Sequence, residues 1–303
     1  MRAVWRVALI VAFAMVLAAS LVLRQAGATV LLPPIKVIAT TTDIKDLVRT
    51  IGGRQVVVES LAAPSQDPHT LELKPTQLLR MRSADLVIRI GLDHEPWLAR
   101  TSTDAPVLDL SRTIRLLQTD TPRLRAERQA HIHLFGNPHY WLDPNNARPM
   151  VLAITAALTR LRPAEAAYFN ANQAAFLSAL DAQLPQWKAA LAPYAGTRVV
   201  VLHDSWTYFA DCFGLSIVAS AEPSPGIPPS PAELATLFSR MRAAKVRLVI
   251  ANPDSNADLV RQLATHGGAP AVTLVPSVGG DPAADTYLTL IATNVSRLAK
   301  ALR

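Results

Sequence analysis

The chain has 303 residues, of which half are hydrophobic and 17% are charged, with a formal net charge of +7. This length is sufficient for two domains of ordinary size, and the composition is that of a globular protein. The sequence has no Lys/Arg-rich run and no basic patch interleaved with aromatic residues, so nucleic acid is not an expected partner. The single cysteine, Cys212, excludes an intramolecular disulfide and a thiolate zinc cluster. Any metal site must therefore use mainly histidine, carboxylate or water ligands.

Residues 1–28 have the pattern of an export signal, which predicts a periplasmic protein. Arg2 and Arg6 precede an apolar run over residues 7–23, and the small residues at 26–28 offer a cleavage site. The apolar run is long for a signal peptide and lies at the short limit for a helix that spans a membrane. An uncleaved membrane anchor is therefore the alternative.

Residues 29–163 are predicted to form a first α/β lobe, because short β-branched runs alternate with helical patterns. Strands are predicted at residues 35–39, 55–61, 86–90 and 107–110, and helices at residues 44–51, 76–82 and 147–161. Buried strands separated by helices favour a parallel sheet that is covered on both faces. Residues 111–136 have no clear period and are predicted to form a loop or lid.

Residues 164–192 are predicted to form one long helix that joins two lobes. Pro163 ends the preceding helical pattern, and apolar and small residues then recur at helical spacing up to Leu191. This helix is longer than the average helix of a globular protein.

Residues 193–303 are predicted to form a second α/β lobe with a similar order of elements. Strands are predicted at residues 198–202, 216–219, 246–251 and 271–275, and helices at residues 205–212, 232–244, 257–265 and 284–302. A proline-rich stretch at residues 223–231 predicts a rigid loop. The expected architecture is thus two lobes with mostly parallel sheets, joined by a long rigid helix.

Three histidines occupy loops where a ligand could bind. Ligands of open α/β sheets lie beyond the carboxyl ends of the strands. His203 directly follows a predicted strand, His69 lies in a loop after another, and His139 lies in a short loop between Pro138 and Pro144. A proline restricts its own φ and the residue before it, so the backbone of this loop is stiff. We expect the three imidazoles to converge on one metal ion.

Zinc is the metal that three imidazoles predict, because neutral imidazole suits zinc whereas manganese and magnesium prefer oxygen ligands. A fourth donor would complete a tetrahedral shell. Asp281 follows a predicted strand and is the first candidate, Glu222 is the second, and water is the third. An alternative role for Asp281 is that of the residue capping the last helix.

The other histidines and the cysteine have less definite roles. His131 and His133 form a His-x-His pair in the predicted lid, where they either collect metal weakly or are a solvated surface pair. His94 and His266 are predicted to be surface residues. Cys212 is predicted to be a small buried hydrophobic residue.

Several motifs occur in the same order as in a known family. They are VIATTTDIKDL at residues 37–47, DPHTLELKP, NPHYWLDP, LHDSWTYFADCFGL, EPSPGIPPSP and the closing TYLTLIATNVSRLAKAL. In these motifs, which span nearly all of residues 35–303, the sequence resembles the zinc- and manganese-specific solute-binding proteins of bacterial ABC importers, the ZnuA-like and TroA-like group.

The resemblance implies two α/β lobes with the metal between them. Matched by motif, His69, His139 and His203 look like the first, second and third ligands of the family, and a histidine at the third position resembles the zinc-type members. His131 and His133 look like the remnant of a histidine-rich loop.

Two positions depart from the family pattern. Pro276 or Ser277 stands where the family usually has its fourth ligand, an aspartate, so either Asp281 replaces it or the site uses three histidines and water. In addition, Asn252 stands where the family often has a glutamate.

The expected function is that of a monomeric periplasmic protein that captures Zn²⁺ and delivers it to an ABC transporter permease of the inner membrane, without enzymatic activity. Zinc affinity is expected to fall as the pH drops through the range in which histidine titrates. One alternative is a Mn²⁺-binding transport protein, and another is a surface adhesin. A zinc-dependent hydrolase is a further alternative, with an open fourth position on the metal and Asp204 or Glu222 as a base.

Overall fold

The computed structural model describes residues 32–303 except for residues 65, 102, 118–135 and 223–226, and residues 34–303 form one compact unit. The predicted signal segment, most of the predicted lid, and with it His131 and His133, lie outside the described residues. Within the described ranges, no helix has both the length and the continuous apolar character that a bilayer span requires.

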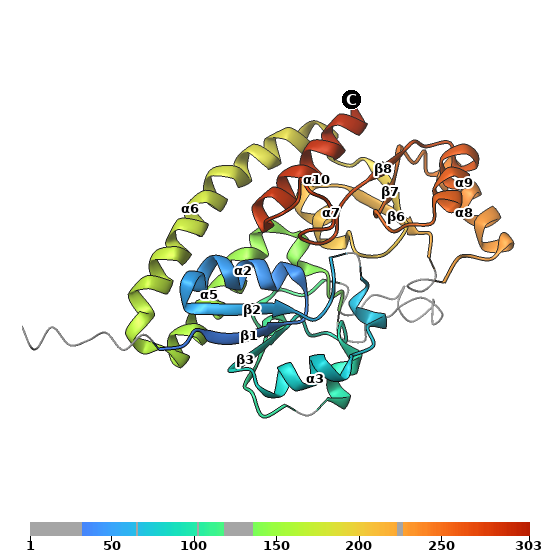
Figure 1. The fold of residues 1–303 in the computed structure, drawn as a ribbon. Coiled ribbons are helices and arrows are strands. Elements are labelled where there is room, and N and C mark those ends of the chain that lie inside the picture. Colours follow the sequence, from blue (N-terminus) through green and yellow to red (C-terminus); the bar gives the residue numbers. More distant parts are fainter. Residues whose placement is uncertain (1–31, 65, 102, 118–135, 223–226) are drawn as a thin grey trace, which may run out of the picture. The chain divides into compact units, whose positions relative to one another are not determined.

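The first sheet has four parallel strands in the order β2-β1-β3-β4. Its strands are β1 (Ile35–Ala39), β2 (Val56–Ser60), β3 (Leu86–Arg89) and β4 (Val107–Asp109), and the helices around it are α2 (Thr42–Gly52), α3 (Pro75–Arg82) and α5 (Ala147–Leu161). Figure 1 shows α2 on one side of this sheet and α3 on the other. An apolar cluster lies on each side, so both faces are covered, as the β-branched runs predict.

The second sheet repeats this arrangement with the strand order β6-β5-β7-β8, again all parallel. Its strands are β5 (Arg198–Val201), β6 (Ser216–Ser220), β7 (Leu248–Ala251) and β8 (Ala271–Thr273), and its helices are α7 (Thr207–Phe213), α8 (Pro231–Ala243), α9 (Ala257–Gly267) and α10 (Tyr287–Leu302). A separate apolar cluster fills the space between this sheet and the pair α8 and α9. The prediction of two α/β lobes with parallel sheets is confirmed.

The helix starts follow local capping chemistry. The Thr41 side chain accepts a hydrogen bond from the backbone of α2, and Ser230 and Thr286 form capping boxes at α8 and α10. The last helix therefore begins at Tyr287, three residues later than its apolar pattern predicts, because Thr286 provides the cap.

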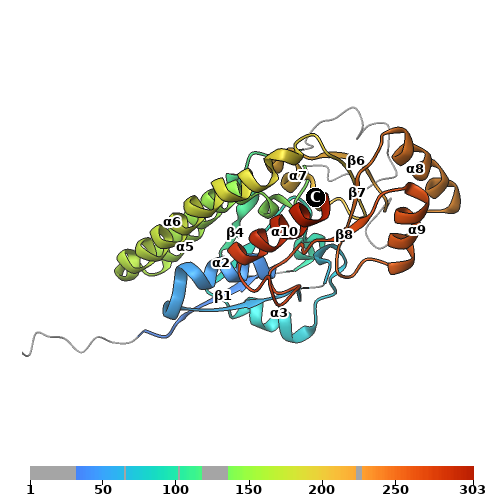
Figure 2. The ribbon, with the colours of Figure 1, turned by 90° about the horizontal axis from the view of Figure 1, so that it is seen from above.

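The predicted long helix is α6 (Ala166–Leu191), which is preceded by the 3-10 turn Pro163–Glu165 and followed by the 3-10 turn Ala192–Tyr194. It contacts α2 and α5 beside the first sheet and α10 beside the second. Figures 1 and 2 both show α6 running along α5 and reaching the neighbourhood of α10. One apolar core cluster includes residues from both sheets and from α6, so the helix joins two lobes that share a core.

Candidate metal site

His69 lies in the short 3-10 turn Pro68–Thr70, which follows β2. The carboxylate of Asp67 accepts a hydrogen bond from the His69 backbone N–H at 2.9 Å, and the Pro68 carbonyl accepts one from Trp97 Nε1 at 2.8 Å. These two bonds fix the backbone of the first two residues of the turn, from which the imidazole projects.

His139 is almost completely buried, with 5% of its surface exposed. The side-chain oxygen of Asn137 accepts the His139 backbone N–H at 3.0 Å and lies 3.0 Å from His139 Nδ1. Because an amide oxygen only accepts hydrogen bonds, Nδ1 must carry the ring hydrogen. The lone pair of Nε2 is then available to a metal, which is the arrangement that outer partners of ligating histidines provide.

His203 follows β5 and is oriented by Glu222, which follows β6. His203 Nδ1 lies 3.4 Å from a carboxylate oxygen of Glu222. Burial lowers the pKa of His203, but the Glu222 hydrogen bond and the charges of Asp67, Glu222 and Asp204 outweigh this effect and leave the pKa raised. A carboxylate on Nδ1 favours the tautomer that presents Nε2 to a metal.

The structure brings these three histidines together. Each offers one ligand nitrogen, and the three nitrogens all lie within 4.8 Å of one another. The ring centroids are 5.8 Å apart between His69 and His139 and 5.4 Å apart between His139 and His203. Two ligands of a tetrahedral zinc ion at about 2.0–2.1 Å are roughly 3.3–3.4 Å apart, so small side-chain shifts close the site around an ion.

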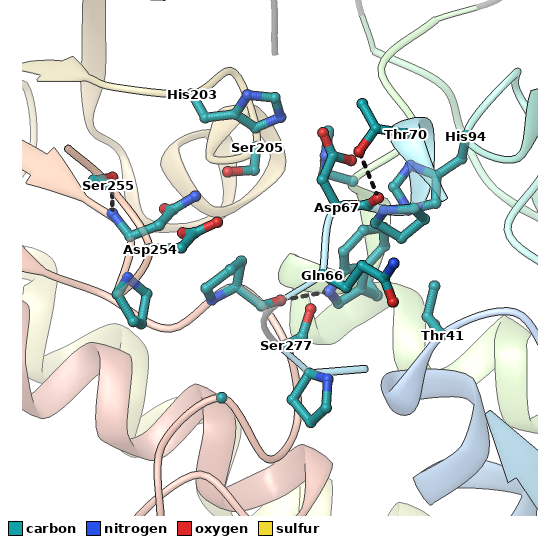
Figure 3. A pocket seen from close by; sticks show the side chains of 18 of the residues that line it. Thr41, Gln66, Asp67, Thr70, His94, His203, Ser205, Asp254, Ser255 and Ser277 are labelled. Atoms are coloured by element: carbon teal, nitrogen blue, oxygen red, sulfur yellow. Dashed lines mark hydrogen bonds between the residues drawn. The ribbon is translucent and has the colours of Figure 1, made fainter. Parts of the chain in front are cut away.

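His139 and His203 line a cavity at the carboxyl ends of the strands of both sheets, and Figure 3 shows His203 at its edge. The first sheet contributes Thr41 after β1, Asp67 after β2 and His94 after β3; the second contributes His203 after β5, Glu222 after β6, Asn252 after β7 and Ser277 after β8. His69 adjoins this lining through its ring contacts with His94 and His139. The strand-end rule used on the sequence therefore locates the cavity.

Asp281, the first candidate for the fourth ligand, is not among the described residues that line this cavity. One of its carboxylate oxygens accepts a hydrogen bond from Arg297 at 2.7 Å, and the other accepts one from the Ala283 backbone at 2.9 Å. The Arg297 bond holds the pKa of Asp281 below its usual value. Asp281 thus stabilises the turn before α10, whose N-cap is Thr286. Glu222, the second candidate, does line the cavity, and so do Pro276 and Ser277, the two residues that stand near the family's usual fourth-ligand position.

The prediction that His94 is a surface residue is wrong. Its side chain is 1% exposed, its Nδ1 lies 3.3 Å from His69 Nε2, and its ring lies 5.3 Å from that of His139. The cause is the backbone after β3, where Gly91, Leu92 and Asp93 all have positive φ and turn His94 inward. The strand-end rule would have found His94, because it follows the predicted strand at residues 86–90 more closely than His69 follows the one at residues 55–61. The prediction that His266 is exposed is confirmed.

Two parallel α/β lobes joined by a long helix, with a histidine cluster at the strand ends, define a solute-binding protein of the metal type. A family model described as ZnuA, zinc-uptake complex component A periplasmic, matches residues 37–301. The chain belongs to this family.

Relatives in the family have several metals in their names. The chain is 30% identical over 277 residues to the high-affinity zinc uptake system protein ZnuA of Paracoccus denitrificans. This alignment covers 80% of this chain and 84% of the relative. It is 27% identical over 278 residues to the iron-binding protein YfeA of Yersinia pestis, covering 88% and 85%. A crystal structure of ZnuA matches with a TM-score of 0.75 and 26% identity, over 89% of this chain and all of the other.

Proposed function

We propose that this protein captures Zn²⁺ in the cavity between its two sheets and delivers the ion to the permease of an ABC importer in the inner membrane. The observation that carries the proposal is the convergence of His69, His139 and His203, whose ligand nitrogens lie within 4.8 Å of one another. Membership of the zinc-uptake family supports transport rather than catalysis as the purpose of this convergence.

The ligand chemistry favours zinc over manganese, the alternative ion that the sequence leaves open. Three neutral imidazoles suit zinc, whereas manganese and magnesium prefer carboxylate, carbonyl and water oxygens. The carboxylates nearest the cluster already have structural partners: Glu222 binds His203, and Asp67 binds the His69 backbone. The first shell is therefore rich in nitrogen, and Mn²⁺ is the weaker of the two candidate ions.

The export pattern of residues 1–28 and the family description support a periplasmic location. In that compartment the protein would act as a monomer that presents the loaded cavity to the permease. Release of zinc then needs only small movements of the loops after β2, β5 and β6 and of the loop that carries His139.

Calorimetric titration of the metal-free protein with zinc, with His139→Ala and His266→Ala as paired variants, tests the proposal. His139 is the central histidine of the cluster, whereas His266 is exposed on α9. We expect one zinc ion to bind to wild type and to His266→Ala, and binding to be lost or greatly weakened in His139→Ala. Absence of zinc binding by wild type, or equal binding by both variants, would refute the proposal.

A further inference from the structure

We propose that His94 is the fourth donor of the zinc site, so that the ion is held by four imidazoles instead of three imidazoles and a carboxylate or water. This inference rests on the proposed zinc function and names a ligand in addition to His69, His139 and His203.

His94 and His69 already lie as close together as two ligands of one zinc ion. His94 Nδ1 lies 3.3 Å from His69 Nε2. Two nitrogen ligands on one tetrahedral zinc ion are separated by roughly 3.3–3.4 Å, because each Zn–N bond is about 2.0–2.1 Å long. The two nitrogens therefore already have the spacing of two ligands on one zinc ion. The hydrogen between the two nitrogens leaves that position when zinc binds, and the neutral ring that carried it keeps one N–H by changing tautomer.

His94 belongs to the same cluster of imidazole rings as the other ligands. Its ring centroid lies 4.6 Å from that of His69 and 5.3 Å from that of His139, and the residue lines the same cavity as His203. Figure 3 shows His94 and His203 on opposite sides of this cavity. Among the described residues, the ligand nitrogens of His69, His139 and His203 are all close to one another. His94 is in contact with two of these histidines, His69 and His139.

The loop that carries His94 has a strained backbone that buried contacts hold in place. Leu92 and Asp93 have φ values of 57° and 58°, a backbone conformation that costs a non-glycine residue free energy. Buried Glu95 holds this loop, since its carboxylate accepts hydrogen bonds from the backbone N–H groups of Ile90 at 2.8 Å and Gly91 at 2.9 Å. Strain of this kind persists where the surroundings impose it, and it is concentrated at functional sites.

The oxygen donors that the sequence offered as a fourth ligand are engaged elsewhere or bind zinc weakly. Asp281 is bound by Arg297, and Glu222 lies against Nδ1 of His203. Ser277 offers only a neutral hydroxyl. A shell of four imidazoles also favours zinc over the oxygen-preferring manganese ion.

X-ray absorption at the zinc edge of the loaded wild-type protein tests the proposal without any mutation. We expect four imidazole nitrogens at about 2.0 Å from zinc. His94→Ala is expected to show three nitrogens and one oxygen, and its zinc affinity is expected to fall by at least the roughly 10- to 100-fold that loss of an outer-shell partner costs.

His94→Gln, which keeps a polar side chain in the loop, is the second variant, and His266→Ala is the matched control. Both variants at residue 94 are expected to lose one nitrogen from the shell, while the control keeps four. A wild-type shell of three nitrogens and one oxygen, or a shell unchanged in His94→Gln, would overturn the assignment of His94 and leave the proposed zinc function intact. A wild type that binds no zinc would overturn both.

Discussion

Single residues outside the ligand set determine which nitrogen each histidine presents. Asn137 is buried and joins two of the ligands: its oxygen binds His139, and its amide nitrogen donates to the Asp204 carbonyl at 2.9 Å, directly after His203. Asn137 thereby fixes the tautomer of His139 and holds the backbone next to His203. Its part in the site could not be predicted from sequence, because the bond to Asp204 exists only once the two sheets are packed together.

Asn137→Ala should weaken zinc binding by about 10- to 100-fold, the usual cost of losing an outer-shell partner of a ligating histidine. The measurement is calorimetric titration, with thermal unfolding recorded in parallel. Asn256→Ala is the matched control, because Asn256 caps α9 and is exposed. The control should lose about 1 kcal/mol of stability and keep its zinc affinity. Equal zinc affinities in the two variants would contradict the role of Asn137.

At the scale of secondary structure, much of the fold could be predicted because the signals are local. Each strand of both sheets is a short β-branched or apolar run, and α6 is a long helical pattern that begins just after Pro163. The roles of residues whose contacts come from distant parts of the chain were less predictable. Asp281 is occupied by Arg297, and His94 is turned inward by a loop that Glu95 holds together with Thr40, whose hydroxyl donates to Glu95 at 2.5 Å. No local pattern contains those pairings.

The contact between α2 and the segment before α10 contains a buried carboxylate. Asp43 accepts a hydrogen bond from the Val278 backbone at 2.9 Å. Burial raises its pKa to about 7, although the Val278 bond acts in the opposite direction. A carboxyl group whose pKa is higher in the folded than in the unfolded protein destabilises the fold as the pH rises from about 4 to about 7.

Asp43→Asn should therefore be more stable than wild type above pH 7 and about equally stable at low pH, because asparagine can accept the Val278 bond without ionising. The rise of the Asp43 pKa from 3.8 to about 7 corresponds to a difference on the order of 4 kcal/mol. Urea unfolding between pH 4 and pH 8.5 measures it. Glu95, whose pKa burial also raises to about 7, should leave part of the pH dependence in the variant. Parallel stability curves for the two proteins would contradict this account of Asp43.

The junction of the lobes is stabilised by aromatic packing between α6 and α10. Phe176 of α6 is 6% exposed, and its ring lies 6.2 Å from that of Tyr287. Phe176→Ala should cost about 3–5 kcal/mol in the free energy of unfolding. Leu152→Ala, at an exposed position of α5, should change it by less than about 0.5 kcal/mol. Similar losses in the two variants, measured by urea unfolding, would show that this contact does not stabilise the junction.

At the scale of the whole molecule, the two sheets are copies of one strand order whose carboxyl ends face a common cavity. The lobes also bind each other directly: Trp141 Nε1 donates to the Pro276 carbonyl at 2.8 Å, and Tyr287 donates to the Trp141 carbonyl at 2.5 Å. Because one apolar core runs through both lobes, wide separation of the sheets would expose buried aromatic side chains. Metal capture therefore depends on loop and side-chain adjustments around a rigid frame.

A crystal structure of the zinc-loaded protein, with anomalous scattering recorded on both sides of the zinc absorption edge, is the most direct test of this arrangement. The account predicts one strong anomalous peak in the cavity, within bonding distance of a ring nitrogen from each of His69, His139 and His203. A peak bonded to fewer than two of these histidines, or placed outside the cavity, would contradict it.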